Sequence, residues 1–224
     1  MVSPAVPRSA PTTEPGRGSS RIPAQEGRPP QTLRRVAQGV DACRRCDLWR
    51  EATQGVPGEG RSTMKLMLVG EQPGDREDVT GRPFVGPAGR VLEQALITAG
   101  LSRDEVYVTN AVKHFKHEQR GKRRIHQTPN RSEVSACRWW LDAERRIVRP
   151  RAIVALGATA ALAVFGRPVR IGASRTHVFH IDDQTRAVVT YHPSFLLRIR
   201  DPGAKAQTEA AFIEDLKLAM SLIG

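Results

Sequence analysis

The stretch Met64–Asp75 reads Met-Lys-Leu-Met-Leu-Val-Gly-Glu-Gln-Pro-Gly-Asp. Its first part is almost wholly apolar and predicts a buried strand that ends at Gly70. Glu71 and Gln72 follow at once, and the chain then turns sharply at a Pro-Gly pair. A carboxylate and a carboxamide are therefore expected at the end of a strand, where open α/β sheets bind their ligands. The alternative is an ordinary connection in which Glu71 is solvated.

Signals for strands and helices alternate through the rest of the chain. Apolar runs predict strands over residues 105–109, 152–156, 177–181 and 186–190. Apolar residues at helical spacing predict helices over residues 91–99, after Thr128, over 158–165 and at the C-terminus. This alternation favours a mostly parallel sheet covered by helices on both faces, that is, a three-layer α/β/α fold.

Two of these helices carry more specific predictions. Thr128-Pro129 resembles an N-cap followed by proline at the first helical position. The helix after it places Val134, Cys137 and Leu141 on one face. In the closing helix, the residues expected to face inward are Ile213, Leu216, Met220 and Ile223.

Composition limits the classes of function. The 224 residues include 35 Lys and Arg against 23 Asp and Glu, which gives a formal net charge of +12. Excess positive charge favours a polyanionic partner, because Lys and Arg release counterions from phosphates. The longest apolar run, Ala152–Phe165, falls short of the roughly 18 residues that span a membrane. Without an apolar signal segment, and with an odd number of cysteines, a cytoplasmic protein is expected.

The first 31 residues differ in composition from the rest. They are rich in Pro, Ser, Gly and Arg and offer little to bury, which predicts a disordered tail. Residues 32–224 are expected to form a single domain.

Three segments that follow predicted strands carry unusual residues. The Gly-rich segment Gly81–Gly89 contains Phe84 and leads into a helix, whose N-terminus favours an anion. Asn110 closes the second strand, and its carboxamide can both donate to and accept from the edge of a pyrimidine. His192 precedes a proline, which restricts it to extended geometry and aims it past the last strand. An imidazole there can donate to a developing anion. A turn-forming asparagine is the simpler interpretation of Asn110.

A basic run, Lys113–Arg124, follows the second strand and continues to His126 through Lys122-Arg123-Arg124-Ile125-His126. Its position at the ligand-binding edge predicts a loop that contacts phosphates. His126 ends the run and is expected to point into the site, although a lone histidine is more often structural.

Cys43 and Cys46 form a CxxC pair, which is typical of a redox couple, a zinc half-site or an iron–sulfur half-site. The redox interpretation fails because the pair lies upstream of the first strand. Cys137 supplies a third ligand, and His114 is the best candidate for the fourth. Spacing alone does not separate zinc from a [4Fe–4S] cluster.

Five motifs in this order resemble the uracil-DNA glycosylase superfamily, specifically its iron–sulfur family 4 branch. The motifs are Gly-Glu-Gln-Pro-Gly at 70–74, Pro-Phe-Val-Gly-Pro-Ala-Gly at 83–89, Thr-Asn-Ala-Val-Lys-His at 109–114, Lys-Arg-Arg-Ile-His at 122–126 and His-Pro-Ser at 192–194. The similarity runs from Cys43 to the C-terminus. Within the branch the sequence looks most like the UdgX group, because Lys-Arg-Arg-Ile-His is not expected in ordinary family 4 enzymes.

The resemblance implies a uracil-DNA glycosylase-like α/β/α fold that flips uracil out of DNA and cleaves its glycosidic bond. By position, Phe84 stacks on the flipped base and Asn110 reads its Watson–Crick edge. His192 donates to uracil O2, and Glu71 lies near the sugar carbon C1′. Further residues implied to bind the substrate are Gln72, Asp75 and Arg124.

The UdgX group implies a different fate for the sugar. The histidine of the Arg-Arg-Ile-His loop, here His126, captures C1′ in place of water and leaves the protein covalently joined to the abasic site. Glu71 holds the ring of His126 or takes its proton, and Arg124 braces the loop or binds a phosphate. Contacts to the DNA backbone are expected from Lys122, Arg123, Ser194 and Arg198.

Family 4 members typically bind their cluster through four cysteines, and His114 stands where this sequence departs from that pattern. The resemblance therefore implies a structural [4Fe–4S] cluster held by Cys43, Cys46, His114 and Cys137, with zinc in the same ligands as the runner-up. The expected partner is uracil-containing DNA, with no nucleotide cofactor, no membrane and a monomeric state. Two other functions stay open: a conventional turnover glycosylase, and a non-catalytic, metal-stapled DNA-binding module.

Overall fold

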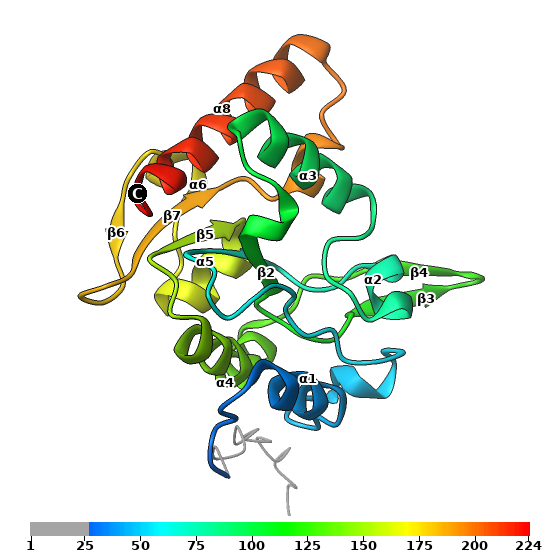
Figure 1. The fold of residues 1–224 in the computed structure, drawn as a ribbon. Coiled ribbons are helices and arrows are strands. Elements are labelled where there is room, and N and C mark those ends of the chain that lie inside the picture. Colours follow the sequence, from blue (N-terminus) through cyan, green and yellow to red (C-terminus); the bar gives the residue numbers. More distant parts are fainter. Residues whose placement is uncertain (1–26) are drawn as a thin grey trace, which may run out of the picture.

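A computed structural model describes residues 27–224 of the chain (Figure 1). Most of the predicted tail, residues 1–26, lies outside the described residues, and residues 27–31 contain neither helix nor strand. Among the described residues, no helix is both long and apolar enough to cross a membrane.

A five-stranded sheet in the order β2-β1-β5-β7-β6 forms the centre of the molecule. Four strands run parallel and only the edge strand β6 is antiparallel, so the predicted mostly parallel sheet is confirmed. The strands are β1 (Leu66–Gly70), β2 (Val106–Asn110), β5 (Ala152–Leu156), β6 (Phe179–His180) and β7 (Arg186–Thr190). The strand predicted over residues 177–181 is thus shorter than expected.

Helices cover both faces of the sheet, as the sequence predicts (Figure 1). One layer comprises α1 (Leu33–Asp41), α4 (Arg131–Val148) and α5 (Ala158–Phe165). The other comprises α3 (Pro87–Ala99), α7 (Pro193–Leu196) and α8 (Pro202–Ser221). Alternation along β1 separates the two cores, since Met67 packs in the α4 layer and Leu68 in the α3 layer.

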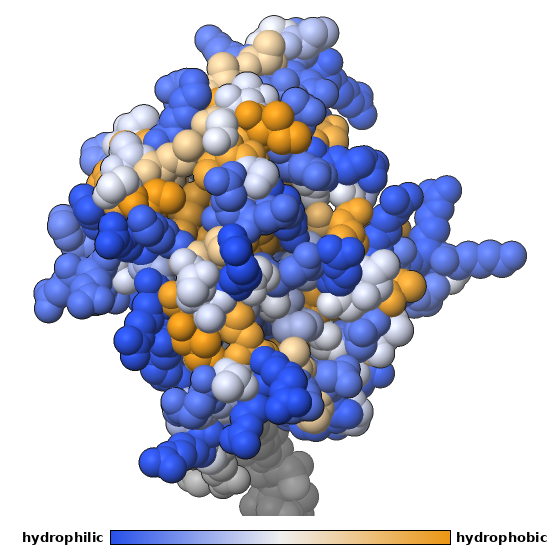
Figure 2. All heavy atoms as spheres, in the orientation of Figure 1, coloured by the Kyte–Doolittle hydropathy of each residue, from blue (hydrophilic) through white to orange (hydrophobic). Residues whose placement is uncertain are grey.

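The segment predicted as a phosphate-contacting loop is in fact a β-hairpin that projects from the body (Figure 1). Its strands are β3 (His117–Arg120) and β4 (Arg123–His126), which pair only with each other. Gly121 has a φ of +59° in the two-residue turn between them, a conformation that glycine adopts readily. Figure 2 shows that the surface of this projection is mostly hydrophilic.

Four shorter helices complete the fold. They are α2 (Asp75–Thr80), α6 (Ile171–Ser174) and two single 3₁₀ turns, Asp47–Arg50 and Arg103–Glu105.

One helix prediction is corrected, and a second is confirmed with a difference in which residues are most deeply buried. The N-cap of α4 is Asn130 and not Thr128, because Asn130 accepts from the Glu133 N–H at 2.9 Å while the Glu133 carboxylate accepts from the Asn130 N–H at 2.7 Å. This reciprocal capping box stabilises a helix start two residues later than Thr-Pro suggested. In α8 the fully buried residues are Phe212, Asp215, Leu216 and Ala219, while the other predicted inward residues, Ile213, Met220 and Ile223, are partly buried and pack against the same core.

The chain does not cross the sheet in a single direction, because it reverses after β2. From β1 the chain passes to β2 on one side, and from β2 through the hairpin and α4 to β5 on the other side. Residues just beyond the carboxyl ends of β1 and β5, Glu71 and Gly157, therefore flank a crevice in which α/β sheets bind ligands.

Candidate active site at the carboxyl edge of the sheet

A cavity of about 710 Å³ opens at this point. It is lined by residues that follow β1, β2, β5 and β7 and by the end of the hairpin. The structure thus brings together most of the residues that the sequence singled out, namely Glu71, Gln72, Asp75, Phe84, Asn110, His126, His192, Ser194 and Arg198.

Asn110 and Phe84 form the inner wall. The Asn110 side chain is only 2% exposed, and its Oδ1 has no hydrogen-bond partner among the described residues. A Cβ on Gly70 would lie 2.3 Å from that Oδ1 and 2.5 Å from the Phe84 ring, so only glycine allows both to reach the cavity. A buried acceptor without a partner costs free energy. Asn110 Oδ1 is therefore placed to accept from an N–H group of a ligand.

His192 presents one defined ring nitrogen to the cavity. Its Nδ1 accepts from the Ser194 backbone N–H at 3.2 Å and lies 2.8 Å from the Ser194 hydroxyl. A neutral imidazole with Nδ1 as acceptor carries its proton on Nε2. Burial lowers the pKa of His192 to about 4, against the opposing effect of Glu71. At neutral pH the ring is therefore an uncharged donor with its Nε2–H free.

The lowered pKa of His192 predicts an acid-sensitive fold. The unfolded histidine titrates near pH 6.5 and the folded one near 4, so between these values only the unfolded chain binds the proton. The free energy of unfolding should fall by about 3 kcal/mol as the pH drops through this window. Denaturant unfolding at pH 7 and pH 4 would show a smaller fall in His192→Gln than in the wild type, and an equal fall in both would contradict the assignment.

Glu71 pairs with His126 at the mouth of the cavity. Glu71 Oε1 lies 3.2 Å from His126 Nε2, and Oε2 accepts from the Thr159 hydroxyl at 2.7 Å. Burial raises the pKa of Glu71, but the hydrogen bonds from His126 and Thr159 outweigh it and the net pKa lies below its usual range. Glu71 is therefore a carboxylate that accepts from His126 Nε2–H. The His126 side chain remains 49% exposed, open to a ligand in the cavity.

Gln72 fastens the base of the hairpin to the end of β1. Its Nε2 donates to the carbonyls of Lys116 at 3.1 Å and Gln127 at 3.0 Å, and its Oε1 accepts from the Lys116 N–H at 2.9 Å. Lys116 and Gln127 lie next to the two ends of the hairpin, just outside its strands. The Gln72 carboxamide is thus occupied by backbone groups, although the residue lines the cavity.

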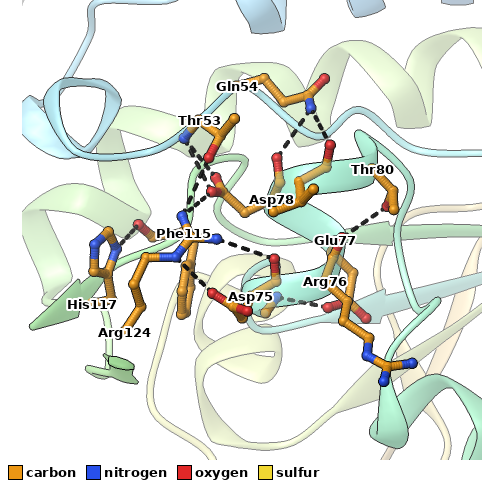
Figure 3. Close-up of polar contacts among 12 residues, drawn as sticks. Thr53, Gln54, Asp75, Arg76, Glu77, Asp78, Thr80, Phe115, His117 and Arg124 are labelled. Atoms are coloured by element: carbon orange, nitrogen blue, oxygen red, sulfur yellow. Dashed lines mark hydrogen bonds and ion pairs between the residues drawn. The ribbon is translucent and has the colours of Figure 1, made fainter. Parts of the chain in front are cut away.

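Arg124 links the hairpin to α2 through two ion pairs (Figure 3). Its Nε lies 2.6 Å from Asp75 Oδ1 and its Nη1 lies 2.5 Å from Asp78 Oδ2. Asp78 is fully buried and also accepts from the Thr53 N–H at 3.0 Å. Arg124 and His126 are two residues apart in β4 and therefore lie on the same face of the strand, so the two ion pairs of Arg124 also fix the orientation of that face. Arg124 and Asp75, both predicted to bind substrate, contact each other.

The basic run is not a uniform phosphate-binding surface. Lys113 is fully buried and its Nζ lies 2.7 Å from Glu144 Oε2, so the prediction that it contacts phosphate is wrong. Lys116 pairs with Glu133 and Arg120 with Glu118. Within residues 27–224, the cations of this run that form no ion pair are Lys122 and Arg123, which lie exposed at the hairpin tip.

Cys43, Cys46 and Cys137 lie near one another and form the thiol region, and each sulfur accepts an N–H. Cys43 Sγ accepts from Trp140 Nε1 at 3.1 Å, Cys137 Sγ from the Lys113 backbone at 3.2 Å, and Cys46 from the Leu48 backbone. Burial, with smaller contributions from Cys46 and Cys43, raises the pKa of Cys137 to about 12 against the opposing effect of Lys113. The three thiols are therefore close enough to interact electrostatically.

His114, the fourth predicted ligand, is also buried. Burial and the neighbouring Arg44 lower its pKa, which keeps the ring neutral. In the described part of the chain, no three His, Cys, Asp or Glu side chains are close enough to hold a single metal ion.

Residues 57–217 match the family model described as the Uracil DNA glycosylase superfamily. The chain belongs to the uracil-DNA glycosylase superfamily. A type-4 uracil-DNA glycosylase of Thermotoga maritima is 38% identical over 189 residues, which cover 84% of this chain and 93% of that protein. One from Pyrobaculum aerophilum is 37% identical over 74% of this chain and 85% of its own length. A type-5 uracil-DNA glycosylase from the same organism is 34% identical over 69% and 72%.

These matches confirm the predicted superfamily and its similarity to the type-4 branch, whereas membership of the UdgX group stays a prediction. Several residues of this superfamily member were not found by sequence reasoning. Thr159 lies in the first turn of α5, directly after β5, and its position beyond a strand end is a signal that was available. Asp78 and Glu144 carry no such signal, since their importance comes from partners far along the chain.

Proposed function

We propose that this superfamily member excises uracil from DNA and becomes covalently joined to the resulting abasic site through His126. The observation that carries the proposal is the pairing of His126 Nε2 with the Glu71 carboxylate, 3.2 Å apart, at the mouth of the cavity. A nucleophile next to a base is the arrangement that covalent catalysis requires. The type-4 and type-5 relatives, named as uracil-DNA glycosylases, support uracil as the base.

Recognition of the base relies on Asn110 and Phe84. A flipped uracil presents an N3–H donor beside its O4 acceptor. Asn110 Oδ1, which lacks a partner in the described structure, accepts from N3–H while its amide nitrogen donates to O4. Cytosine has an unprotonated N3 and an amino group at these positions, so it places acceptor against acceptor and donor against donor. Phe84, buried against Asn110, supplies the apolar face on which the base stacks.

Cleavage of the glycosidic bond leaves its electron pair on uracil N1, and the negative charge spreads to O2. His192 Nε2–H donates to O2, and because the ring is neutral it does so without transferring a full proton. The sugar is left with positive charge at C1′. The Glu71 carboxylate at the cavity mouth stabilises that charge.

Capture completes the reaction. After uracil has left, His126 Nε2 forms a bond to the positively charged C1′, and the Nε2 proton passes to Glu71 in the same step. The products are the uracil anion, protonated Glu71 and an imidazole alkylated at C1′. Since His126 occupies the face from which water would attack, the adduct is not hydrolysed.

The experiment mixes purified protein with a labelled single strand that contains one uracil, followed by heating in SDS and a denaturing gel. We expect a slow band with the uracil strand and none with a matched thymine strand. Free abasic product without a slow band identifies a conventional turnover glycosylase. Absence of both products identifies a DNA-binding module without catalysis.

Arg124 is expected to affect capture more than uracil release. Replacement by Met removes the ion pairs to Asp75 and Asp78 and lets the His126 strand move, while Phe84, Asn110 and His192 stay in place. A misplacement of about 1 Å can cost about 10²-fold in rate. Quench-flow analysis of both products should show adduct formation reduced by about that factor and release by much less. Equal losses in both would mean that Arg124 acts on the base pocket.

The thiol region suits a [4Fe–4S] cluster as a structural cofactor, held by Cys43, Cys46, His114 and Cys137. The sulfurs accept N–H donors, as ligand thiolates do, and their environment is buried. Zinc in the same ligands is the runner-up, and metal analysis of the purified protein separates the two. A cluster bound by these residues would link the segment before β1, which holds Cys43 and Cys46, to α4, which holds Cys137, and its role would be structural.

Purified protein is therefore expected to be brown and to contain about four iron atoms per chain. His114→Ala should lower the iron content, whereas His117→Ala, a histidine in the same segment outside the thiol region, should not. Iron analysis and absorbance spectra measure both. A colourless, iron-free preparation that is fully folded would overturn the assignment.

A further inference from the structure

Behind the base pocket, Lys113 and Glu144 form an ion pair with both side chains 0% exposed. Lys113 Nζ uses all three of its N–H groups, on Glu144 Oε2 at 2.7 Å, on the Thr109 hydroxyl at 2.6 Å and on the Asn110 carbonyl at 2.9 Å. Glu144 also accepts from the Thr109 hydroxyl and the Gly58 N–H. A buried ion pair is a costly way to stabilise a fold, since apolar residues of similar volume often do so equally well. Its contacts therefore point to another role.

The contact to Asn110 is the informative one. Asn110 is the last residue of β2, an edge strand whose strand neighbour is β1 and whose other side carries an isolated bridge between Val108 and Glu59, two residues before Asn110. The peptide of Asn110 is thus held by the sheet from one side. Lys113 Nζ donates a hydrogen bond to the Asn110 carbonyl and so holds this peptide where no second strand does.

Lys113 also contacts the thiol region through its backbone. Its N–H donates to Cys137 Sγ at 3.2 Å, and its carbonyl accepts from the Val56 N–H at 2.8 Å. Cys137 and Glu144 both lie on the buried side of α4, so Lys113 contacts this helix at two positions along its length, by its backbone and by its side chain. The end of β2 is therefore fixed to α4 and not only to the sheet.

We propose that the Lys113–Glu144 pair is a positioning device that holds the Asn110 backbone, and hence its carboxamide, in register with the flipped base. Lys113 contacts no substrate and acts through Asn110. This inference rests on the proposed excision of uracil. It adds that the ion pair between Lys113 and Glu144 of α4, which lies outside the base pocket, determines how accurately the Asn110 carboxamide meets the base.

A double-mutant cycle tests the proposal. Lys113→Met together with Glu144→Gln removes both charges while keeping side-chain volume and an oxygen for the Gly58 N–H. We measure uracil release from single-stranded DNA under single-turnover conditions, in chains with Asn110 and in Asn110→Ala chains. The paired change should slow release about tenfold to a hundredfold with Asn110 present. It should slow release less than about twofold in Asn110→Ala, because two residues that act through one another are not additive.

A charge-matched control is Lys217→Met with Glu214→Gln, an exposed pair on α8 that should leave the rate unchanged in both backgrounds. Equal slowing by the buried change in both backgrounds, or no slowing, overturns the proposal. If the double variant is unfolded at the assay temperature, Glu144→Gln alone carries the same test. A wild-type protein that releases no uracil refutes the proposed function, whereas additive effects in an active protein refute only this inference.

Discussion

Replacing His126 by alanine is expected to abolish the covalent complex while uracil release persists within about tenfold of the wild-type rate. Glu71, Asn110 and His192 remain in place in this variant, so the base is still held and still leaves as a stabilised anion. Water then enters the space vacated by the imidazole and attacks C1′. The denaturing gel should show free abasic strand in place of the slow band.

The matched control is His117→Ala. His117 is the cross-strand partner of His126 in the hairpin, so this variant removes an imidazole from the same two-stranded element. The slow band should remain at full intensity. A slow band that survives in His126→Ala but is lost in His117→Ala would assign the nucleophile to the other strand.

Replacing His192 by alanine is expected to lower the rate of uracil release by about 10² to 10³-fold, the usual cost of losing one donor to a developing anion. Adduct formation should fall by the same factor, because C1′ becomes electrophilic only as the base departs. His192 thus differs from His126, whose loss separates release from capture. Single-turnover kinetics on labelled single strands measure both products.

Ser194→Ala provides the graded comparison. The Ser194 backbone N–H still donates to His192 Nδ1 at 3.2 Å and keeps the Nε2 proton in place. Only the hydroxyl at 2.8 Å is lost, so the rate should fall by less than about tenfold. A loss in Ser194→Ala as large as in His192→Ala would mean that the hydroxyl, and not the imidazole, carries the effect.

The layered fold was predictable because apolar strands and amphipathic helices each carry a local periodic signal. Several residues of the cavity were predictable for a related reason, since they stand at or just beyond the ends of strands that meet at one edge. Glu71, Asn110 and His192 all follow this rule, and the structure brings them to one cavity.

The hairpin was not predictable from such signals, because neither of its strands covers a core and both are largely polar. Partners far along the chain were equally hidden. Arg124 reads as one more cation in a basic run, and only the fold reveals that Asp75 and Asp78 occupy its guanidinium. Lys113 reads the same way, yet burial and Glu144 turn it into a structural residue.

The isolation of the hairpin from the main sheet has an evolutionary consequence. Because β3 and β4 pair only with each other, their length and sequence can change without altering the order or register of the five central strands. Under the proposed function, residues at the ends of the central strands remove the base, and the β3–β4 hairpin supplies the residue that captures the sugar. An ancestor that releases its product and a descendant that keeps it would then differ by the growth of one loop, with the inherited framework intact.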